Sequence, residues 1–301
     1  MQQGRASTRT TRILVDTISP SIRLDQKIFS TRHRLTYKIM KIEGRVFVVT
    51  GGASGLGEGT CRMICANGGK VVIVDIQEDK AHAVVASLPS GAATFIKMDA
   101  TKEQSISDAI EAAGKKWGRI DGCVNCAGVG MGKSTVNRKG VPHDMKSFEF
   151  IIRLNLLGTF SVASKCAAWM VKNDPDENGE RGTIINVASV AAQDGQNGQA
   201  AYSASKAGVV GMALPMARDM GSRGVRINTI LPGIMATPLT AGFNTPAGAR
   251  VGDNLKKAQV FPTDRFGVPS EFAELAKFLI ESPIMNAEAV RFDGGIRMPK
   301  L

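Results

Sequence analysis

The chain has 301 residues, 43% of them hydrophobic, so it can bury a core without disulfides or a structural metal. Its formal net charge is +11, of which residues 1–39 carry +6 and the other 262 residues only +5. The mild charge of this main body argues against a nucleic-acid-binding domain, whose positive charge would cluster on the fold itself.

Other compositional features exclude further classes. Gly, Ser, Asn or Asp interrupt the apolar stretches before the roughly 18 residues that a membrane-spanning helix needs. The five cysteines form no evenly spaced framework, which indicates free thiols in a reducing compartment. The three histidines, His33, His82 and His143, are far apart, so we expect no histidine-rich metal site.

Residues 1–39 form a basic tail that is rich in Ser, Thr and Arg and poor in acids. This composition is typical of a cleaved mitochondrial import segment and equally of a disordered tail. Translation beginning at Met40 is a third interpretation, and the sequence leaves all three open.

Strands and helices alternate from Arg45 onward. Apolar runs typical of strands buried on both faces predict strands at Val46–Thr50, Lys70–Asp75, Ala93–Lys97, Gly122–Asn125, Thr183–Val187 and Val225–Leu231. Helices are predicted at Thr60–Ala66, Lys102–Trp117, Gln199–Met220 and Glu271–Ile280. This order predicts a single α/β domain over residues 40–301, with a parallel sheet and helices on both faces.

A glycine-rich turn, Thr50-Gly-Gly-Ala-Ser-Gly-Leu-Gly57, follows the first predicted strand. Glycines let a phosphate approach backbone amides, and the N-terminus of the next helix adds partial positive charge. The spacing differs from the common G-x-G-x-x-G pattern, but a strand before the turn and a helix after it are the context that this motif requires. The turn therefore predicts a dinucleotide site.

Asp75 ends the second predicted strand, 18 residues after Gly57. A carboxylate there can accept hydrogen bonds from both ribose hydroxyls of an adenosine and would repel a 2′-phosphate. Residues 76–80 contain no arginine that could bind such a phosphate. Asp75 therefore favours NAD over NADP, and it could cap the next helix at the same time.

Tyr202-Ser-Ala-Ser-Lys206 places a phenol and an ammonium on one face of a helix. Lowering the pKa of a phenol enough to work near neutral pH costs roughly 4 kcal/mol. A cation at about 4 Å supplies about 4 kcal/mol at an effective dielectric near 20, but only about 1 kcal/mol in water. Lys206 is thus sufficient only in a mostly dehydrated site. Ser189 ends a predicted strand, at the sheet edge where open α/β sheets bind ligands.

Four ordered motifs together resemble the short-chain dehydrogenase/reductase family. They are the glycine-rich turn, Asn125-Cys-Ala-Gly128, a serine before Tyr-x-x-x-Lys, and Pro232-Gly233. The resemblance covers residues 42–299 and implies a doubly wound Rossmann domain with about seven strands. A closer resemblance, in residues 198–206, 214–219 and 290–298, is to family members that oxidise 3-hydroxyacyl-CoA or 17β-hydroxysteroids.

The resemblance also implies roles for the matching residues. Tyr202 would be the base in alcohol oxidation and the acid in reduction, Lys206 would lower its pKa and hold the nicotinamide ribose, and Ser189 would bind the substrate oxygen. Asn155 would anchor a proton relay, and Gln199 would line the substrate side. The matching cofactor-binding positions are Gly51, Ser54, Gly55, Leu56, Gly57, Asp75, Asp99, Ala100, Asn125, Cys126, Tyr202, Lys206, Met235 and Thr237.

Two further features have simpler interpretations. Cys123 and Cys126 form a C-x-x-C, but residues three apart in a strand face opposite sides, so we expect neither a redox pair nor a zinc site. The polar segment 131–144 resembles an insertion that borders the substrate cleft. Its Lys133, Arg138 and Lys139 either attract coenzyme A phosphates or only solvate a surface loop.

The prediction is an NAD-dependent dehydrogenase, without a metal, that interconverts 3-hydroxyacyl-CoA and 3-oxoacyl-CoA in fatty acid β-oxidation. A steroid or other secondary alcohol as substrate, and a non-catalytic subunit of an RNA-processing complex, are the alternatives. The resemblance implies a homotetramer. The basic tail favours the mitochondrial matrix, whereas the C-terminal Pro299-Lys-Leu301 is close to the peroxisomal Ser-Lys-Leu signal.

Overall fold

The computed structural model describes residues 40–298, all of which belong to one compact unit. The basic tail and the C-terminal Pro-Lys-Leu lie outside the described residues. Seven parallel strands form one sheet in the order β3-β2-β1-β4-β5-β6-β7. They are β1 Val46–Thr50, β2 Lys70–Asp75, β3 Ala93–Lys97, β4 Gly122–Asn125, β5 Gly182–Val187, β6 Val225–Pro232 and β7 Ala289–Phe292. The predicted doubly wound α/β fold is confirmed.

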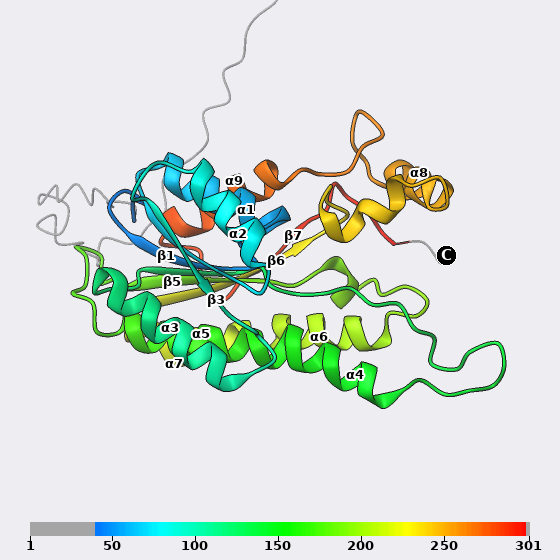
Figure 1. Ribbon diagram of the computed structural model, residues 1–301, viewed down its shortest axis with the longest axis horizontal. Helices are drawn as coiled ribbons and strands as arrows, with labels where there is room; N and C mark the ends of the chain where they lie inside the picture. Colours follow the sequence, from blue (N-terminus) through cyan, green and yellow to red (C-terminus); the bar gives the residue numbers. More distant parts are fainter. Residues whose placement is uncertain (1–39, 299–301) are drawn as a thin grey trace, which may run out of the picture. The chain divides into compact units, whose positions relative to one another are not determined.

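Helices cover both faces of the sheet because the central strands are apolar on both sides (Figure 1). Phe47 and Val49 of β1 pack into one core and Val48 packs into the other. The first core contains residues of α1 Gly55–Ala66, α2 Glu78–Ser87 and α9 Pro269–Glu281. The opposite face is covered by α3 Glu103–Trp117, α5 Thr159–Met170, α6 Ala200–Gly211 and α7 Ala213–Gly221.

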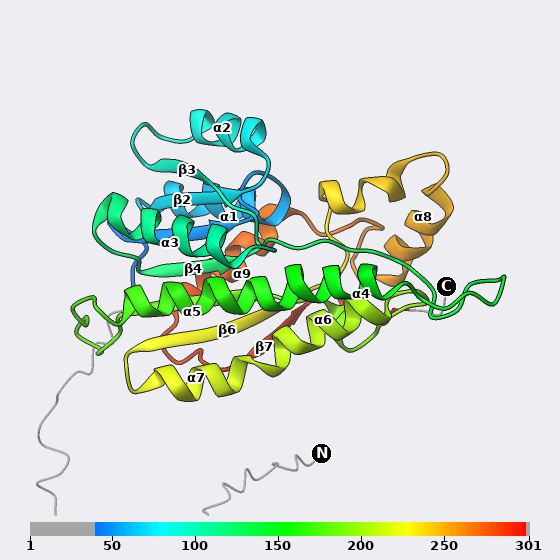
Figure 2. The same ribbon diagram turned by 60° about the horizontal axis from the view of Figure 1, so that its bottom comes forward.

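A long helix precedes β5 and has no counterpart among the predicted elements. It consists of α4 Met145–Ile152, the π-helical turn η2 Arg153–Gly158, and α5, and it runs along one side of the sheet in Figure 2. Its polar residues are accommodated within it: Thr159 Oγ1 donates to the Asn155 carbonyl at 2.7 Å.

This helix also corrects the expectation that no stretch could span a membrane. Among residues 40–298, Met145–Met170 is long and apolar enough to qualify by length and composition. Within the fold, 44% of its most apolar window is buried, and α5 packs against β4, β5 and α3. Packing against the sheet accounts for the apolar composition of that side of the helix.

Some predicted helix boundaries were also wrong. Helix α1 begins at Gly55, five residues before the predicted Thr60. The helix expected over 199–220 is broken between α6 and α7, because the ring of Pro215 would clash with the carbonyl of Gly211 four residues earlier. Helix α9 begins at Pro269 rather than Glu271, since proline is favoured at the first helical position. The remaining short elements are η3 Val190–Ala192, η4 Pro238–Asn244 and α8 Ala249–Ala258.

Candidate active site

The glycine-rich turn between β1 and α1 needs glycine at specific positions. Gly51 and Gly55 have φ angles of 65° and 54°, a region that L side chains rarely adopt. A Cβ on Gly57 would lie 2.2 Å from the carbonyl oxygen of Gly51. The turn is therefore closed on itself, and glycine at these positions keeps its backbone compact.

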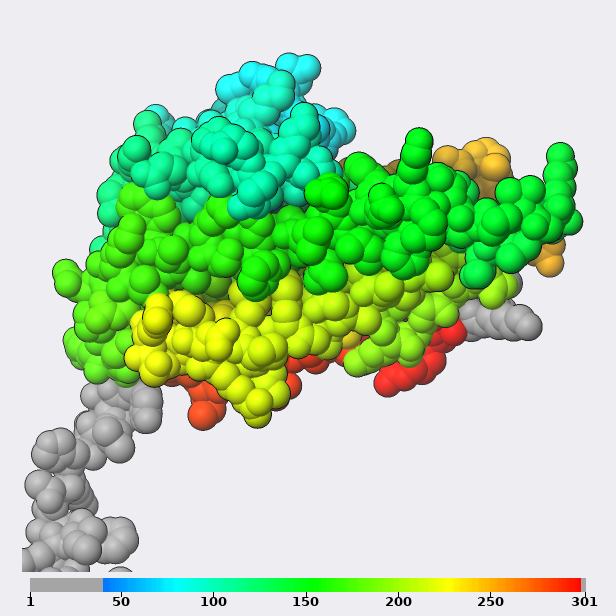
Figure 3. Space-filling model, turned by 90° about the horizontal axis from the view of Figure 1, so that it is seen from below, coloured from blue at the N-terminus to red at the C-terminus, as the bar shows by residue number. Residues whose placement is uncertain are grey.

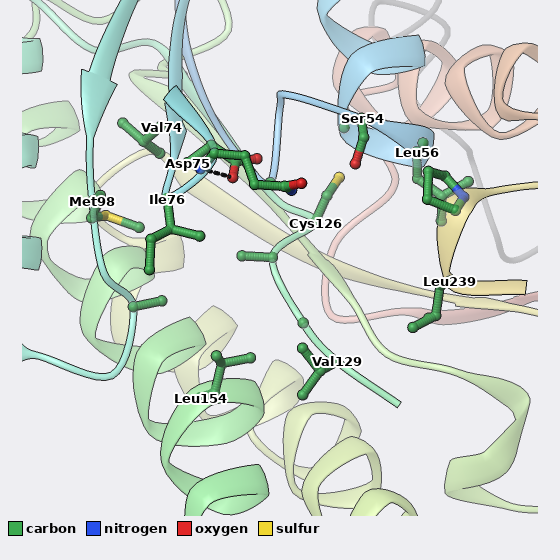
Figure 4. Close-up of a pocket in the computed structure, with 18 of the residues that line it drawn as sticks. Ser54, Leu56, Val74, Asp75, Ile76, Met98, Cys126, Val129, Leu154 and Leu239 are labelled. Carbon is green, nitrogen blue, oxygen red and sulfur yellow. Dashed lines mark hydrogen bonds between the residues drawn. The ribbon is translucent and has the colours of Figure 1, made fainter. Parts of the chain in front are cut away.

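A cavity of about 260 Å³ opens above this turn at the carboxyl edge of the sheet (Figure 4). Ten of the predicted cofactor positions line it: Gly51, Ser54, Gly55, Leu56, Gly57, Asp75, Asp99, Ala100, Cys126 and Thr237. The sequence did not indicate its apolar lining, which includes Ile76, Met98, Val129, Leu154 and Leu239. Of these residues, only Ile76 could have been found from the sequence, since it directly follows Asp75 at the end of the second predicted strand.

Asp75 presents its carboxylate to this cavity from the end of β2. One oxygen accepts from the Gln77 amide at 2.9 Å, drawn as a dashed line in Figure 4, and the other from the Ala53 amide at 3.1 Å. The two backbone bonds fix the carboxylate between β2 and the glycine-rich turn. Each oxygen keeps a lone pair that can accept a hydroxyl hydrogen.

Four predicted cofactor positions lie outside the cavity lining: Asn125 and Met235, and the catalytic pair Tyr202 and Lys206. The Asn125 side chain is buried and donates to Asn186 Oδ1 at 2.9 Å, so it ties β4 to β5. Met235 is buried in the first core, where a Cβ on Gly267 would lie 2.6 Å from its sulfur. The Asn125 and Met235 side chains are therefore packed inside the fold instead of lining the cleft.

The four predicted catalytic residues come from three elements that meet beside the cavity. Ser189 follows β5 and caps η3, Tyr202 and Lys206 lie in α6, and Asn155 lies in η2. Lys206 Nζ is 5.9 Å from the centre of the Tyr202 ring. A Cβ on Gly128, which lines the cavity, would lie 3.2 Å from Asn155 Oδ1 and 3.3 Å from Lys206 Nζ.

The pKa shifts of Tyr202 and Lys206 differ from what the sequence predicted. Burial raises the pKa of the Tyr202 phenol, and a hydrogen bond with Ser189 opposes that rise. Burial also lowers the pKa of Lys206 to about 8. The Lys206 ammonium donates to the Val187 carbonyl at 2.8 Å, so it faces the strand rather than the phenolic oxygen. Burial, opposed by the hydrogen bond with Ser189, therefore sets the direction of the Tyr202 pKa shift, and the predicted lowering by Lys206 stays a prediction.

Asn155 and Gln199 are both held by hydrogen bonds. Asn155 is fully buried; its Oδ1 accepts from the Val129 amide at 3.0 Å, and its Nδ2 donates to Ser205 Oγ at 3.1 Å. It therefore joins the chain lining the cavity to the catalytic helix. Gln199 Oε1 accepts from the Gln196 amide at 2.9 Å and faces the preceding loop. Its contact with substrate stays a prediction.

The cysteines of the site are unreactive by environment. Cys123 packs into the second core and Cys126 against the first, as the alternation of a strand predicts. Burial raises the pKa of Cys126 to about 12, so its thiol stays protonated. Residues 40–298 contain no group of three or more His, Cys, Asp or Glu side chains placed to hold a metal ion.

Comparison with known proteins decides the family. Residues 45–247 match the model of the short chain dehydrogenase family. The chain belongs to this family. It is therefore an oxidoreductase, and the family implies a nicotinamide cofactor.

Three relatives are similar over most of the chain. A Drosophila melanogaster 3-hydroxyacyl-CoA dehydrogenase type-2 is 44% identical over 258 residues, which cover 85% of this chain and 99% of the relative. The Homo sapiens protein of that name is 43% identical, with 85% and 97% covered. A crystal structure of the Mycobacterium avium protein of that name is 40% identical, with a TM-score of 0.77 over 85% of this chain and 97% of the other.

Proposed function

We propose that this protein is an NAD-dependent dehydrogenase that interconverts 3-hydroxyacyl-CoA and 3-oxoacyl-CoA in fatty acid β-oxidation. The observation that carries the proposal is the similarity, 42–44% identical over nearly their whole length, to relatives named 3-hydroxyacyl-CoA dehydrogenase type-2. No observation favours a steroid substrate or a subunit of an RNA-processing complex over this activity.

The cavity fits a dinucleotide at both ends. The glycine-rich turn leaves room for a pyrophosphate at the N-terminus of α1, a helix of 12 residues. The Asp75 carboxylate would accept hydrogen bonds from the adenosine ribose and would repel a 2′-phosphate, which supports NAD. Asp99 and Ala100 would lie beside the adenine, and Thr237 near the nicotinamide.

The cofactor, when bound, takes the hydride from the carbinol carbon. The protein handles the proton and the orientation of the alcohol. Ser189 Oγ and Tyr202 Oη, which share a hydrogen bond, would both bond the substrate hydroxyl, and Tyr202 would remove its proton. In the reverse reaction Tyr202 donates that proton. This use of Tyr202 needs a positive charge near the phenol, because burial alone keeps it protonated.

The segment 131–144 offers a site for the coenzyme A phosphates. Its base is fixed beside the catalytic helix, since the Lys133 amide donates to the Gly198 carbonyl at 2.8 Å. An antiparallel bridge between Val136 and Pro142 forms a small hairpin, and Arg138 and Lys139 are exposed at its tip. These two cations support the binding of an anionic nucleotide outside the cleft.

Kinetics with acetoacetyl-CoA test the proposal directly. We expect turnover with NADH and at least about 100-fold lower kcat/KM with NADPH, a difference of roughly 3 kcal/mol from repulsion at Asp75. Tyr202→Phe should lower kcat at least about 1000-fold with unchanged folding. Specificity constants that favour a hydroxysteroid over acetoacetyl-CoA would contradict the substrate, and full activity of Tyr202→Phe would contradict the mechanism.

Assembly and location extend the proposal. A homotetramer is supported by three exposed apolar side chains of the helix of α4, η2 and α5: Phe150, Leu157 and Phe160. This helix crosses the face seen in Figure 3 in green. The composition of residues 1–39 supports a mitochondrial location, and fluorescent fusions lacking either terminus would distinguish it from the peroxisome.

A further inference from the structure

Arg291 lies in β7, at the edge of the sheet next to β6, and none of the roles above involves it (Figure 2). Its guanidinium makes four hydrogen bonds to side chains and one to a backbone carbonyl. Only about a fifth of the side chain is exposed. A planar guanidinium whose three nitrogens all donate hydrogen bonds fixes the relative position of the segments that it joins.

One arm of this network reaches the loop that carries Ser189. Arg291 Nη1 donates to Gln193 Oε1 at 2.7 Å, and Nη2 donates to Asp194 Oδ2 at 2.8 Å. Both partners directly follow η3, and the Asp194 amide donates to the Val190 carbonyl at 2.8 Å. Ser189 caps this same turn by accepting from the Ala191 amide at 3.1 Å. The path from Arg291 to Ser189 is therefore short and hydrogen-bonded throughout.

The other arm reaches the chain on the cofactor side. Arg291 Nε and Nη2 donate to Asp293 Oδ2 at 2.9 and 2.6 Å. Asp293 packs on Gly233, where a Cβ would lie 2.8 Å from the Asp293 Cα, and the Gly233 amide donates to the Phe292 carbonyl at 2.9 Å. Four residues later this chain forms the wall of the cofactor cavity at Thr237.

We propose that Arg291 is a positioning residue, which sets the catalytic serine relative to the nicotinamide side of the cleft. The inference rests on the proposed function, because it concerns the alignment of Ser189 with the cofactor. A displacement of about 1 Å at a reacting centre can lower a rate about 100-fold. Arg291 touches neither substrate nor cofactor and acts through Asp194, Gln193 and Asp293.

Steady-state kinetics of Arg291→Met and Asp194→Asn test this inference in the full chain. We expect kcat for acetoacetyl-CoA reduction to fall about 10- to 100-fold for Arg291→Met, with the KM for NADH within about twofold. Asp194→Asn should lower kcat in the same direction but less, and the double variant should show less than the product of the two effects. Arg291→Lys should recover little, because an ammonium cannot hold all these acceptors in one plane.

Arg297→Met is the matched control, because Arg297 lies 3.5 Å from the same Asp293 oxygen but is largely exposed and has no contact with the serine loop. It should keep wild-type kcat. Thermal unfolding, followed for every variant, separates folding from turnover. Wild-type kcat in folded Arg291→Met, or an equal loss in Arg297→Met, overturns the inference. Wild-type protein without activity on acetoacetyl-CoA contradicts the proposed function instead.

Discussion

At the scale of single residues, the site depends on two ionisable groups, Tyr202 and Lys206. Both are buried, and few interactions offset the cost of burying their charged forms. Tyr202 has a raised pKa and Lys206 a lowered one, so burial holds both side chains closer to neutrality than they are in water. Because the Lys206 ammonium donates to a neutral backbone carbonyl, this bond leaves its positive charge available to another neighbouring group. The pair is therefore suited to a site in which a bound cation supplies the positive charge that ionisation of the phenol needs.

The lowered pKa of Lys206 predicts a pH-dependent stability. With a pKa of about 8 in the folded protein and 10.5 when unfolded, this lysine binds more protons in the unfolded state between those values. Stability from this group therefore rises with pH across that window. We expect the free energy of unfolding of wild type to gain about 2 kcal/mol over that of Lys206→Met between pH 8 and pH 10.

Urea unfolding of both proteins at the two pH values measures this difference. Lys116→Met, at an exposed position of α3, is the control and should show no such change relative to wild type. A difference between wild type and Lys206→Met that is constant with pH would show that Lys206 is charged in the folded protein throughout.

At the scale of elements, the glycine-rich turn works only if its two ends touch. Gly57→Ala would place a methyl group 2.2 Å from the Gly51 carbonyl oxygen and force the turn open. We expect the Kd for NADH to rise at least about tenfold, by loss of about 1.4 kcal/mol or more of binding free energy. Fluorescence titration with NADH measures it.

Gly221→Ala is the control for that substitution, since a Cβ at Gly221 at the end of α7 meets nothing within 4 Å. Its Kd for NADH should equal that of wild type, and its stability should change by less than about 1 kcal/mol. An unchanged Kd for NADH in Gly57→Ala would mean that the turn can accommodate a methyl group at this position, which would contradict the prediction.

Most of the sheet could be predicted from the sequence because six strands contain a run of apolar or β-branched residues between turn residues. Strand β7 escaped, since its four residues include Arg291 and are only half-buried. The helix over α4, η2 and α5 was not predicted because Asn155 and Gly158 interrupt its apolar pattern. The polar Asn155 is accounted for by tertiary contacts, since its side chain bonds to Val129 and Ser205.

The candidate site was predictable where a motif fixes the backbone, as in the glycine-rich turn and Asp75. It was not predictable where side-chain direction decides. Asn125 and Met235 stand at motif positions yet pack into the fold. The pKa of Tyr202 likewise depends on how deeply the fold buries the phenol, which spacing along a helix does not determine.

At the scale of the whole molecule, the side of the helix of α4, η2 and α5 that carries Leu157 and Phe160 is the surface through which we propose that the chain assembles. Leu157 and Phe160 are each about half exposed, at 51% and 49%. If copies of the chain pair through this side, a charge at its centre must be buried without a partner, which costs several kcal/mol per subunit. We expect Leu157→Glu to shift a tetramer to smaller species in size-exclusion chromatography with light scattering.

Val136→Glu is the control, since Val136 is similarly exposed at 54% but belongs to the hairpin and not to that helix. It should keep the wild-type mass. A tetramer that survives Leu157→Glu would place the interface elsewhere.

The π-helical turn at Arg153–Gly158 has a consequence for how this helix tolerates change. Each residue of an α-helix advances the chain by about 100° around the helix axis, whereas a π turn spreads a similar rotation over one more residue. Removing a single residue from this turn would let the chain relax into regular winding while the helices on either side keep nearly the same register. A one-residue deletion inside Arg153–Gly158 should therefore disturb the packing of the flanking helices less than the same deletion within α5, which would rotate one part of the helix against the other by about 100°.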